Sequence, residues 1–289
     1  MNDSSSMAGR ICLVTGATSG IGRATAEALA RSGATLIVHG RDERKTREFL
    51  AELKAGPDAG DAHMVLADFA SLSAVRALAD EIRERFGALH VLVNNAGVLT
   101  DRRKVSDDGF EWTFAVNHLA SFLLSRLLFD LLQENAPARI AFNSSSAMGG
   151  AHLDFSDLQM ERTFDGWTAY ANTKLANMLT ANLLAEMYAA SGVVSNSFCP
   201  GLIDTNLLAG NHDFGEAGIA RLQSAMRSVE DGAITPVFLA SAPQAEQING
   251  AYFLKSHGNG TTPLQIRWDR QAAERLWSVS QDYVSRWLD

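Results

Sequence analysis

The sequence has few of the features that would place a protein outside the cell or in a membrane. Its only two cysteines, Cys12 and Cys199, lie in apolar, strand-like runs, so we interpret them as buried free thiols in a reducing compartment. The longest apolar stretch, residues 122–132, is too short to span a bilayer and contains charged residues. Residues 1–8 lack the basic start and apolar centre of a secretion signal. We therefore predict a cytoplasmic protein without a membrane partner.

Positive charge is also scarce. The 25 Lys and Arg residues face 33 Asp and Glu residues, which gives a net charge of −8 and argues against a broad basic surface for nucleic acid. The seven histidines show no metal-ligand spacing, so we predict no metal site and interpret His39, His118 and His152 as structural or surface residues. No repeat or low-complexity linker divides the 289 residues, which suffice for one large core.

Short apolar runs alternate regularly with helical patterns along the chain. We predict strands at residues 11–15, 34–39, 62–67, 89–94, 139–143, 193–198 and 251–254, with helices at 21–32, 43–54, 73–86, 109–134 and 168–190. This alternation predicts an α/β fold: a single-domain, Rossmann-like, doubly wound, mostly parallel seven-stranded sheet with helices on both faces. We assign residues 1–9 to a flexible tail and residues 10–289 to the domain, with a substrate lid at about 202–226 and a C-terminal helix at about 270–287.

The first strand leads into a glycine-rich turn with the spacing G-x-x-x-G-x-G, directly before an alanine-rich helix. Glycine lets the backbone approach a pyrophosphate closely, and a helix N-terminus offers free N–H groups and a positive dipole. We predict that a dinucleotide binds here through Gly16, Thr18, Ser19, Gly20, Ile21 and Gly22. A tight turn with a purely structural role is the alternative.

An arginine follows the second strand, where an acidic residue would bind a ribose 2′-hydroxyl and select NAD. His39 and Gly40 occupy the strand end, and Arg41 comes next. Because a guanidinium can hold a 2′-phosphate through charge-assisted hydrogen bonds, we predict NADP(H) as the cofactor. The alternative is that Arg41 is a solvated loop charge, and the neighbouring Asp42 opposes the NADP(H) assignment.

Polar residues also follow the third and fourth strands. Asp68 can accept a hydrogen bond from an adenine amino group, or it can cap the helix that begins near Ser71. In the run Asn94-Asn95-Ala96-Gly97, asparagine side chains can brace strand ends, and the small residues leave room for a flat ligand. We predict cofactor contacts from Asp68, Phe69, Asn95, Ala96 and Gly97.

Tyr170 and Lys174 lie four positions apart on a predicted helix and so share one face. A nearby ammonium lowers the pKa of a tyrosine and suits it to proton transfer near neutral pH. Ser144-Ser145-Ser146 ends the preceding strand, and a hydroxyl there can hold a substrate carbonyl. Asn117 lies within the predicted helix at 109–134, where its poor helix propensity indicates a kink or a bound water.

Together these motifs resemble, in content and order, the short-chain dehydrogenase/reductase superfamily over roughly residues 10–255. Pro200-Gly201 and Thr205, after the sixth strand, complete the pattern. The closer similarity is to the retinol-dehydrogenase-like branch. It rests on Gly-Arg-Asp after the second strand, on Tyr-x-x-x-Lys-Leu-Ala-Asn at 170–177, and on Ala-x-x-Leu-Trp-x-x-Ser at 273–280.

The resemblance implies an oxidoreductase with a catalytic set of Asn117, Ser145, Tyr170 and Lys174. Tyr170 would be the general acid/base, Lys174 would lower its pKa and bind the nicotinamide ribose, and Ser145 would orient the carbonyl. Asn117 would hold a water in a proton relay from Lys174. Pro200, Gly201 and Thr205 would contact the nicotinamide end of the cofactor. Ser145 precedes Tyr170 by 25 residues, about twice the usual family gap, so Ser144 and Ser146 stay open as alternatives.

The resemblance also implies a homodimer or homotetramer through two long helices. An apolar stripe on the first of them is either core or subunit interface, and it comprises Leu119, Phe122, Leu123, Leu127, Leu128 and Leu131. We expect the substrate pocket to draw on Val98, Leu99, residues 148–167 and the lid. Much of this is apolar, which predicts a hydrophobic ketone, aldehyde or secondary alcohol. The alternatives are dehydration or epimerisation without net redox change, and a non-catalytic NADP(H)-binding regulator.

Overall fold

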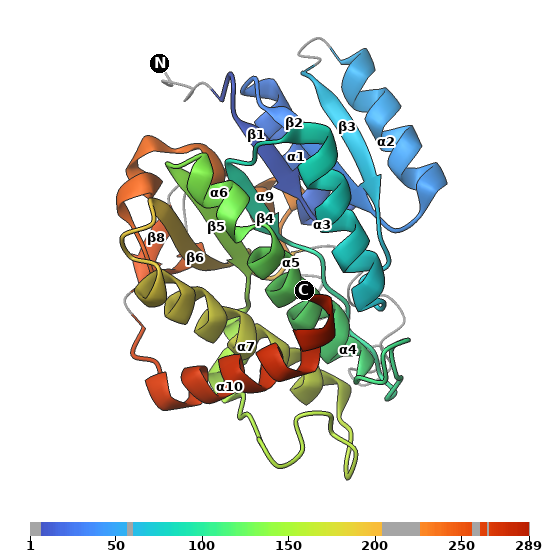
Figure 1. The fold of residues 1–289 in the computed structure, drawn as a ribbon, viewed down its shortest axis with the longest axis vertical. Helices are drawn as coiled ribbons and strands as arrows, with labels where there is room; N and C mark the ends of the chain where they lie inside the picture. Colours follow the sequence, from blue (N-terminus) through green and yellow to red (C-terminus); the bar gives the residue numbers. More distant parts are fainter. Residues whose placement is uncertain (1–6, 57–59, 204–225, 256–260, 265, 289) are drawn as a thin grey trace.

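The computed structural model describes residues 7–56, 60–203, 226–255, 261–264 and 266–288. These residues form one sheet of eight strands with helices on both faces (Figure 1). The strand order is β3-β2-β1-β4-β5-β6-β7-β8, and every neighbouring pair is parallel except β7 and β8. The predicted doubly wound topology is therefore confirmed, with one antiparallel strand added at an edge.

Seven strands lie within a few residues of their predicted positions: β1 (Ile11–Val14), β2 (Thr35–Gly40), β3 (Ala62–Leu66), β4 (Val91–Asn94), β5 (Ala138–Asn143), β6 (Val193–Cys199) and β7 (Tyr252–Lys255). The eighth, β8 (Thr261–Leu264), was not predicted. Its sequence, Thr-Thr-Pro-Leu, has no apolar run and contains a proline, which a sheet tolerates only at an edge. Pairing with β7 therefore creates this strand, and local propensity does not.

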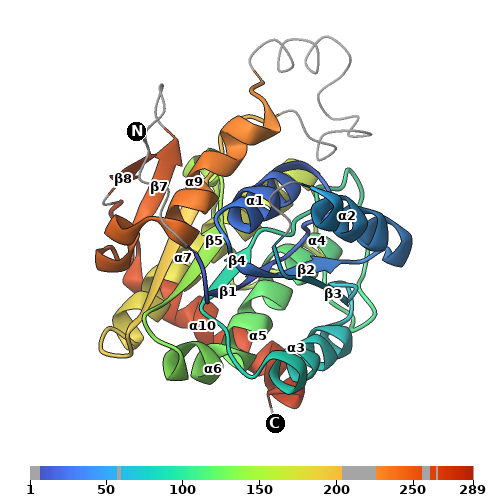
Figure 2. The same ribbon diagram turned by 90° about the horizontal axis from the view of Figure 1, so that it is seen from above.

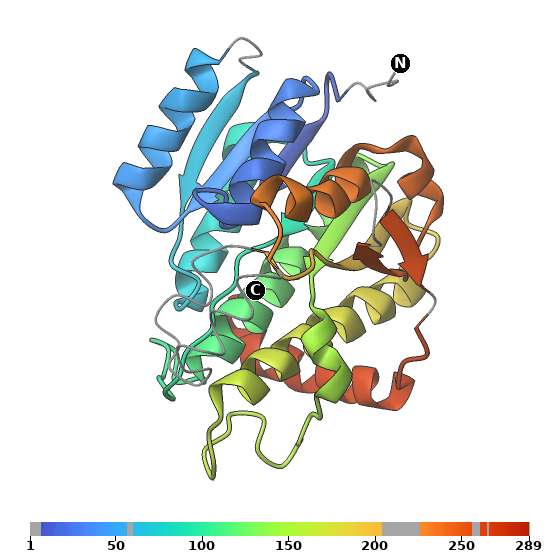
Figure 3. The same cartoon turned by 180° about the vertical axis from the view of Figure 1, so that it is seen from behind.

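The helices form two layers, which Figure 2 shows on opposite sides of the sheet. One layer holds α1 (Gly20–Arg31), α2 (Glu43–Ala55) and α9 (Val229–Ser241), and the other α3 (Leu72–Phe86), α5 (Ala120–Leu127) and α7 (Gly166–Met187). Residues of β1 alternate between them, since Leu13 packs in one core and Cys12 and Val14 in the other. The unpredicted α9 lies beside α1 (Figure 3).

The single helix predicted at residues 109–134 is wrong. The chain turns at Gly109, whose φ is +88°, and the Glu111 carboxylate then accepts the N–H groups of Thr113 and Phe114. This cap starts α4 (Trp112–Phe114), a π-helix follows at Ala115–Leu119, and α6 (Phe129–Glu134) comes after α5. The π-helix contains Asn117, where the sequence indicated an irregularity.

The apolar stripe predicted as core or interface is buried within this one chain. Its six residues are at most 9% exposed. The C-terminal helix α10 (Arg270–Val284) covers this region, with the Trp277 ring edge-on to Phe122 at a centroid distance of 4.9 Å. The homo-oligomer stays a prediction, but the stripe that suggested it is covered by the chain's own helix. Within the described part of the chain, no helix combines the length and apolarity needed to cross a bilayer.

Two predicted segments fall partly outside the described residues. Residues 1–6 of the predicted tail are not described, whereas Met7 is buried and donates its N–H to the Ser32 carbonyl. Residues 204–225 of the predicted lid, Thr205 included, are not described either; Ile203, just before them, forms a bridge with Arg227. The predicted helix at 270–287 is observed as α10 followed by a short 3-10 helix, Ser285–Trp287.

Candidate active site

The glycine turn between β1 and α1 has a backbone that only glycine fits. Gly16 and Gly20 have φ values of +63° and +52°, in the left-handed region. At Gly22 a Cβ atom would lie 2.4 Å from both the Asn95 side-chain nitrogen and the Gly16 carbonyl oxygen. The turn is thus packed directly against the end of β4.

The N-terminus of α1 differs from those of the other helices. Ser19 makes no capping hydrogen bond with its side chain, and the first turn carries no acidic residue. Among the described helices that begin from a loop, all others are capped by a side-chain oxygen, from Asp42, Ser71, Glu111, Asp165, Ser228 and Asp269. The free N–H groups of α1 are a donor set that fits a phosphate.

His39, at the end of β2, forms a hydrogen bond with the backbone of the glycine turn. Its Nδ1 accepts the Gly16 N–H at 3.2 Å, and its Nε2 lies 3.1 Å from the Ala67 carbonyl. Because a carbonyl only accepts, the proton is on Nε2. Burial lowers the pKa of His39 to about 4, so the ring is neutral. Phe69, predicted as a cofactor contact, is itself buried and stacks on this ring at 4.3 Å.

Arg41 projects from the end of β2 and is largely exposed. Its nearest charged partner is Asp68, at 3.9 Å. Asp42, which had opposed the NADP(H) assignment, is the N-cap of α2 and accepts the Lys45 N–H. Ser71, and not Asp68, caps α3, while Asp68 accepts only the Ala70 N–H two residues on. Both Arg41 and Asp68 therefore remain available to a ligand.

Asn95 and Thr15 join the ends of β1 and β4. The Asn95 side chain donates to the Thr15 carbonyl at 2.9 Å, and the Thr15 hydroxyl accepts the N–H groups of Asn95 and Ala96. The Asn95 side chain thus braces the strands. Gly97 is exposed, and a Cβ atom there would lie 3.4 Å from the Lys174 ammonium. Ala96 and Gly97 keep the space beside Lys174 open.

Tyr170 and Lys174 lie together on α7, next to the end of β5. Both are almost fully buried, and the Lys174 ammonium lies 5.2 Å from the centre of the Tyr170 ring. The Lys174 ammonium donates to the Asn143 carbonyl at 3.2 Å. The Ser145 hydroxyl lies near enough to the Tyr170 phenol to lower the pKa of Tyr170. The structure thus brings together three of the four residues predicted as catalytic.

The three consecutive serines have different roles. The Ser144 hydroxyl is buried and donates to the Lys174 carbonyl at 2.7 Å, which ties β5 to α7. Ser146 is exposed, and its N–H donates to the Cys199 sulfur. Adjacent residues of an extended chain point to opposite sides, so only one hydroxyl of the first pair can face Tyr170. That hydroxyl belongs to Ser145.

Burial dominates the titration of the pair on α7. It raises the pKa of Tyr170 well above its usual range, against the hydrogen bond from Ser145, which lowers it. Burial also lowers the pKa of Lys174 to about 8. At neutral pH, Tyr170 is therefore a phenol with a proton to donate, and Lys174 is mostly an ammonium ion.

Asn117 adjoins this pair from the π-helix. Its side-chain oxygen accepts the Val98 N–H at 2.7 Å, and its side-chain nitrogen donates to the Val98 carbonyl and the Thr173 hydroxyl. The Asn117 carbonyl accepts a hydrogen bond from Asn177 at 3.0 Å. Asn117 thus fixes the loop after β4 beside α7. Thr173 was not predicted to belong to the site, and Asn177 entered only as the last residue of the motif at 170–177; their hydrogen-bonding side chains at helix positions were the available signal.

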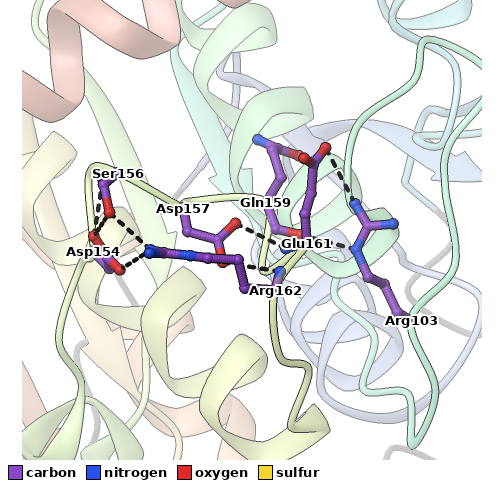
Figure 4. Close-up of polar contacts among 7 residues, drawn as sticks. All are labelled: Arg103, Asp154, Ser156, Asp157, Gln159, Glu161 and Arg162. Atoms are coloured by element: carbon purple, nitrogen blue, oxygen red, sulfur yellow. Dashed lines mark hydrogen bonds and ion pairs between the residues drawn. The ribbon is translucent and has the colours of Figure 1, made fainter.

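Side chains within the segment between Ser145 and Tyr170 form ion pairs and hydrogen bonds with one another (Figure 4). Arg162 pairs with Asp154 and Asp157, and Arg103 donates to the Gln159 carbonyl from the loop after β4. Other residues of the segment line a cavity of about 670 Å³ beside α10: Met148, Leu153 and Phe155, with Leu175 and Leu179 of α7. Helical periodicity puts Leu175 and Leu179 roughly opposite Tyr170. Part of the segment predicted to line the substrate pocket, residues 148–155, therefore lines a cavity on the side of α7 away from Tyr170.

Pro200 and Gly201 follow β6 at the same edge of the sheet. Pro200 is buried, whereas Gly201 is exposed with a φ of +95°. Both cysteines are free and buried, as predicted. In the described ranges, no group of three or more His, Cys, Asp or Glu residues is arranged to hold a metal ion.

The model of the short chain dehydrogenase family matches residues 10–214. The chain belongs to this family. It is 36% identical over 295 aligned residues to retinol dehydrogenase 14 of Mus musculus, covering 96% of this chain and 86% of the relative. It is 37% identical over 284 residues to polyprenol dehydrogenase of Mus musculus, covering 93% and 82%. The solved gluconate 5-dehydrogenase of Burkholderia cenocepacia J2315, in complex with NADP and tartrate, matches with a TM-score of 0.70 and 26% identity, covering 89% and 97% of the two chains. These similarities support the retinol-dehydrogenase-like branch.

Proposed function

We propose that the protein is an NADP(H)-dependent oxidoreductase that transfers hydride between the nicotinamide and a hydrophobic ketone, aldehyde or alcohol. The observation that carries this proposal is the buried Tyr170 phenol beside the Lys174 ammonium, with the Ser145 hydroxyl near enough to lower the pKa of Tyr170, at the same sheet edge as the uncapped N-terminus of α1. In this proposal Tyr170, with Ser145 and Lys174, moves a proton, and the N-terminus of α1 binds a phosphate.

Tyr170 is the general acid in carbonyl reduction. Its phenol is protonated at neutral pH, and it donates its proton to the substrate oxygen as hydride reaches the carbonyl carbon. Ser145 holds that oxygen beside the phenol, and the Lys174 ammonium stabilises the phenolate that results. The reverse reaction uses the phenolate as a base, so alcohol oxidation gains rate as the pH rises.

The residues at the sheet edge fit a bound NADP(H), which supplies or accepts the hydride. The α1 N-terminus and the glycine turn receive the pyrophosphate, and exposed Arg41 receives the 2′-phosphate. Gly97 leaves space for the nicotinamide ribose beside Lys174. NADP in the Burkholderia relative supports the same cofactor here.

An apolar substrate suits the surface next to Tyr170. Trp167, one helical turn earlier, is 40% exposed and lies with its ring 5.7 Å from that of Tyr170. Two relatives are named as dehydrogenases of retinol and of polyprenol, and both of these compounds are apolar isoprenoid alcohols. An exposed aromatic face beside the general acid can bind a substrate of that kind.

The decisive experiment follows NADPH oxidation against a panel of apolar aldehydes and ketones, including retinal and a polyprenal, for wild type and Tyr170→Phe. We expect turnover in the wild type and at least a hundredfold loss in the variant, roughly the contribution of one general acid, with NADPH affinity unchanged. Substrate conversion without NADPH oxidation would favour the non-redox alternative. Tight NADPH binding without any turnover would favour the regulator.

A further inference from the structure

A continuous chain of buried hydrogen bonds runs from the C-terminal helix to the active-site lysine. Ser280 of α10 lies 2.8 Å from Nε2 of His118, and Nδ1 of His118 lies 3.3 Å from the side-chain oxygen of Asn177. The Asn177 side-chain nitrogen donates to the carbonyls of Asn117 and Asn143, and the latter also accepts from Lys174. Ser280, His118 and Asn177 are each at most 1% exposed.

The direction of every hydrogen bond in this chain is determined. Both N–H groups of Asn177 point at carbonyls, so its oxygen faces His118 and can only accept. His118 therefore carries its proton on Nδ1. Burial lowers the pKa of His118 to about 4, so Nε2 carries no proton and accepts from the Ser280 hydroxyl. No other arrangement satisfies all of these groups at once.

Asn177 binds two backbone carbonyls, and one of them also accepts from the lysine. The Asn143 carbonyl is shared with the Lys174 ammonium, and the Asn117 carbonyl is bound by the same Asn177 nitrogen. An ammonium has three N–H donors, and a buried carbonyl without a partner is a strong acceptor for it. With Asn177 in place, the remaining donors of Lys174 are free to face Tyr170 and the space at Gly97.

We propose that Asn177, held by His118 and Ser280, is a positioning residue that keeps the Lys174 ammonium directed at Tyr170. The C-terminal helix is thereby part of the catalytic machinery, although none of its residues reaches the reacting atoms. This inference rests on the proposed function for its kinetic consequence. Its structural part, the placement of the Lys174 ammonium, is measurable without turnover.

The direct test is an NMR titration of the lysine side chains in protein labelled with ¹³C at lysine Cε, with Lys174→Met to assign the signal. The titratable groups that face Lys174 are Tyr170 on α7 and Cys199 at the end of β6, and Tyr252 of β7 lies against Cys199. In Asn177→Leu the ammonium no longer shares the Asn143 carbonyl with another donor, so we expect the pKa of Lys174 to rise by about one unit. Ser280→Ala and His118→Phe should raise it less.

The matched control is Asn182→Leu, which removes a buried asparagine from the same helix. Asn182 is 3% exposed, and its side-chain nitrogen donates to the Met178 sulfur, away from Lys174. It should leave the Lys174 titration unchanged. An unchanged titration in Asn177→Leu, or an equal change in Asn182→Leu, would overturn the proposal. If Asn177→Leu does not fold, Ser280→Ala replaces it in the test, because it deletes only one hydroxyl. An unchanged Lys174 titration in Ser280→Ala would then overturn the proposal.

The kinetic test uses the same variants on a substrate that the wild type turns over. As Lys174 moves away from Tyr170, the phenolate loses stabilisation, and the pH at which alcohol oxidation reaches half its maximal rate should rise. We expect kcat at neutral pH to fall roughly tenfold in Asn177→Leu, with little change in KM. The double variant with His118→Phe should be no slower than Asn177→Leu alone, because both break one chain. Absence of wild-type turnover would contradict the proposed function and leave the NMR result to decide this one.

Discussion

The glycine turn and the α7 cluster lie at the same edge of the sheet but are built in opposite ways. The turn offers backbone donors that the protein leaves unpaired, at an uncapped helix N-terminus. In the α7 cluster, the side chains of Asn117, Asn177 and Ser144 are paired with other groups of the protein. The first region leaves backbone donors open to a negatively charged group, whereas the second holds its side chains in fixed positions.

The largest effect on activity should come from replacing one of the two adjacent serines, Ser145 and not Ser144. Ser145→Ala removes the hydroxyl beside Tyr170, and we expect kcat to fall by about a hundredfold, the usual cost of one donor to a reacting oxygen. Ser144→Ala breaks the bond to the Lys174 carbonyl and a weak contact with the Met148 sulfur, so it should cost about 1 kcal/mol of stability and leave kcat within a few-fold. Steady-state kinetics and thermal unfolding of both variants test this, and equal kcat values would contradict it.

The next effect concerns the packing of the glycine turn. Gly22→Ala places a Cβ atom against Asn95 and the Gly16 carbonyl, so we expect a loss of roughly 1–3 kcal/mol in unfolding free energy and weaker NADPH binding. Gly87→Ala is the control, because Gly87 has a positive φ and no atom within 4 Å of its Cβ position, so the change strains the backbone without a steric clash. It should destabilise by about 1 kcal/mol and leave NADPH binding intact. If both variants bind NADPH as the wild type does, the turn does not receive the cofactor.

A smaller effect distinguishes the two cofactors. Arg41→Ala should weaken NADPH binding by roughly tenfold and leave NADH binding unchanged, since only NADPH carries the 2′-phosphate. Arg44→Ala is matched in charge and exposure, and Arg44 pairs with Glu48 on α2. Fluorescence titrations with both nucleotides measure the difference. Parallel losses for NADH and NADPH in Arg41→Ala would refute a role for Arg41 in selecting the phosphate.

The most gradual effect is a loss of stability in acid. Burial lowers the pKa of His118 to about 4 in the folded protein, against an ordinary value of 6.5, so the unfolded chain binds more protons between these pH values. The free energy of unfolding should therefore fall as the pH drops below 6.5, by about 1.4 kcal/mol per pH unit for this residue. His39 adds a second such contribution. In His118→Phe the unfolding free energy should fall less steeply with decreasing pH, by the equivalent of about one bound proton. Urea unfolding at several pH values measures this slope.

Local sequence signals predicted the first strand and the glycine turn well. The turn at residues 15–22 and the short strand before it lie within a dozen residues, so their geometry follows from glycine conformation and apolar runs alone. The same reasoning placed Tyr170 and Lys174 on one helix face, since a spacing of four is a property of any α-helix. It left open which of three serines faces Tyr170.

The sequence by itself therefore determined the order of strands and helices, the glycine turn and the shared face of Tyr170 and Lys174, because each depends on neighbours along the chain. Tertiary structure alone decided the rest. It formed β8 by pairing with β7. It delayed the start of the helix predicted at 109–134 to Trp112 through the Glu111 cap, and it pointed Ser144 at α7 so that Ser145 meets Tyr170. It also joined Ser280 to His118, 162 residues apart, because a buried polar group must find its partner wherever the packing puts one.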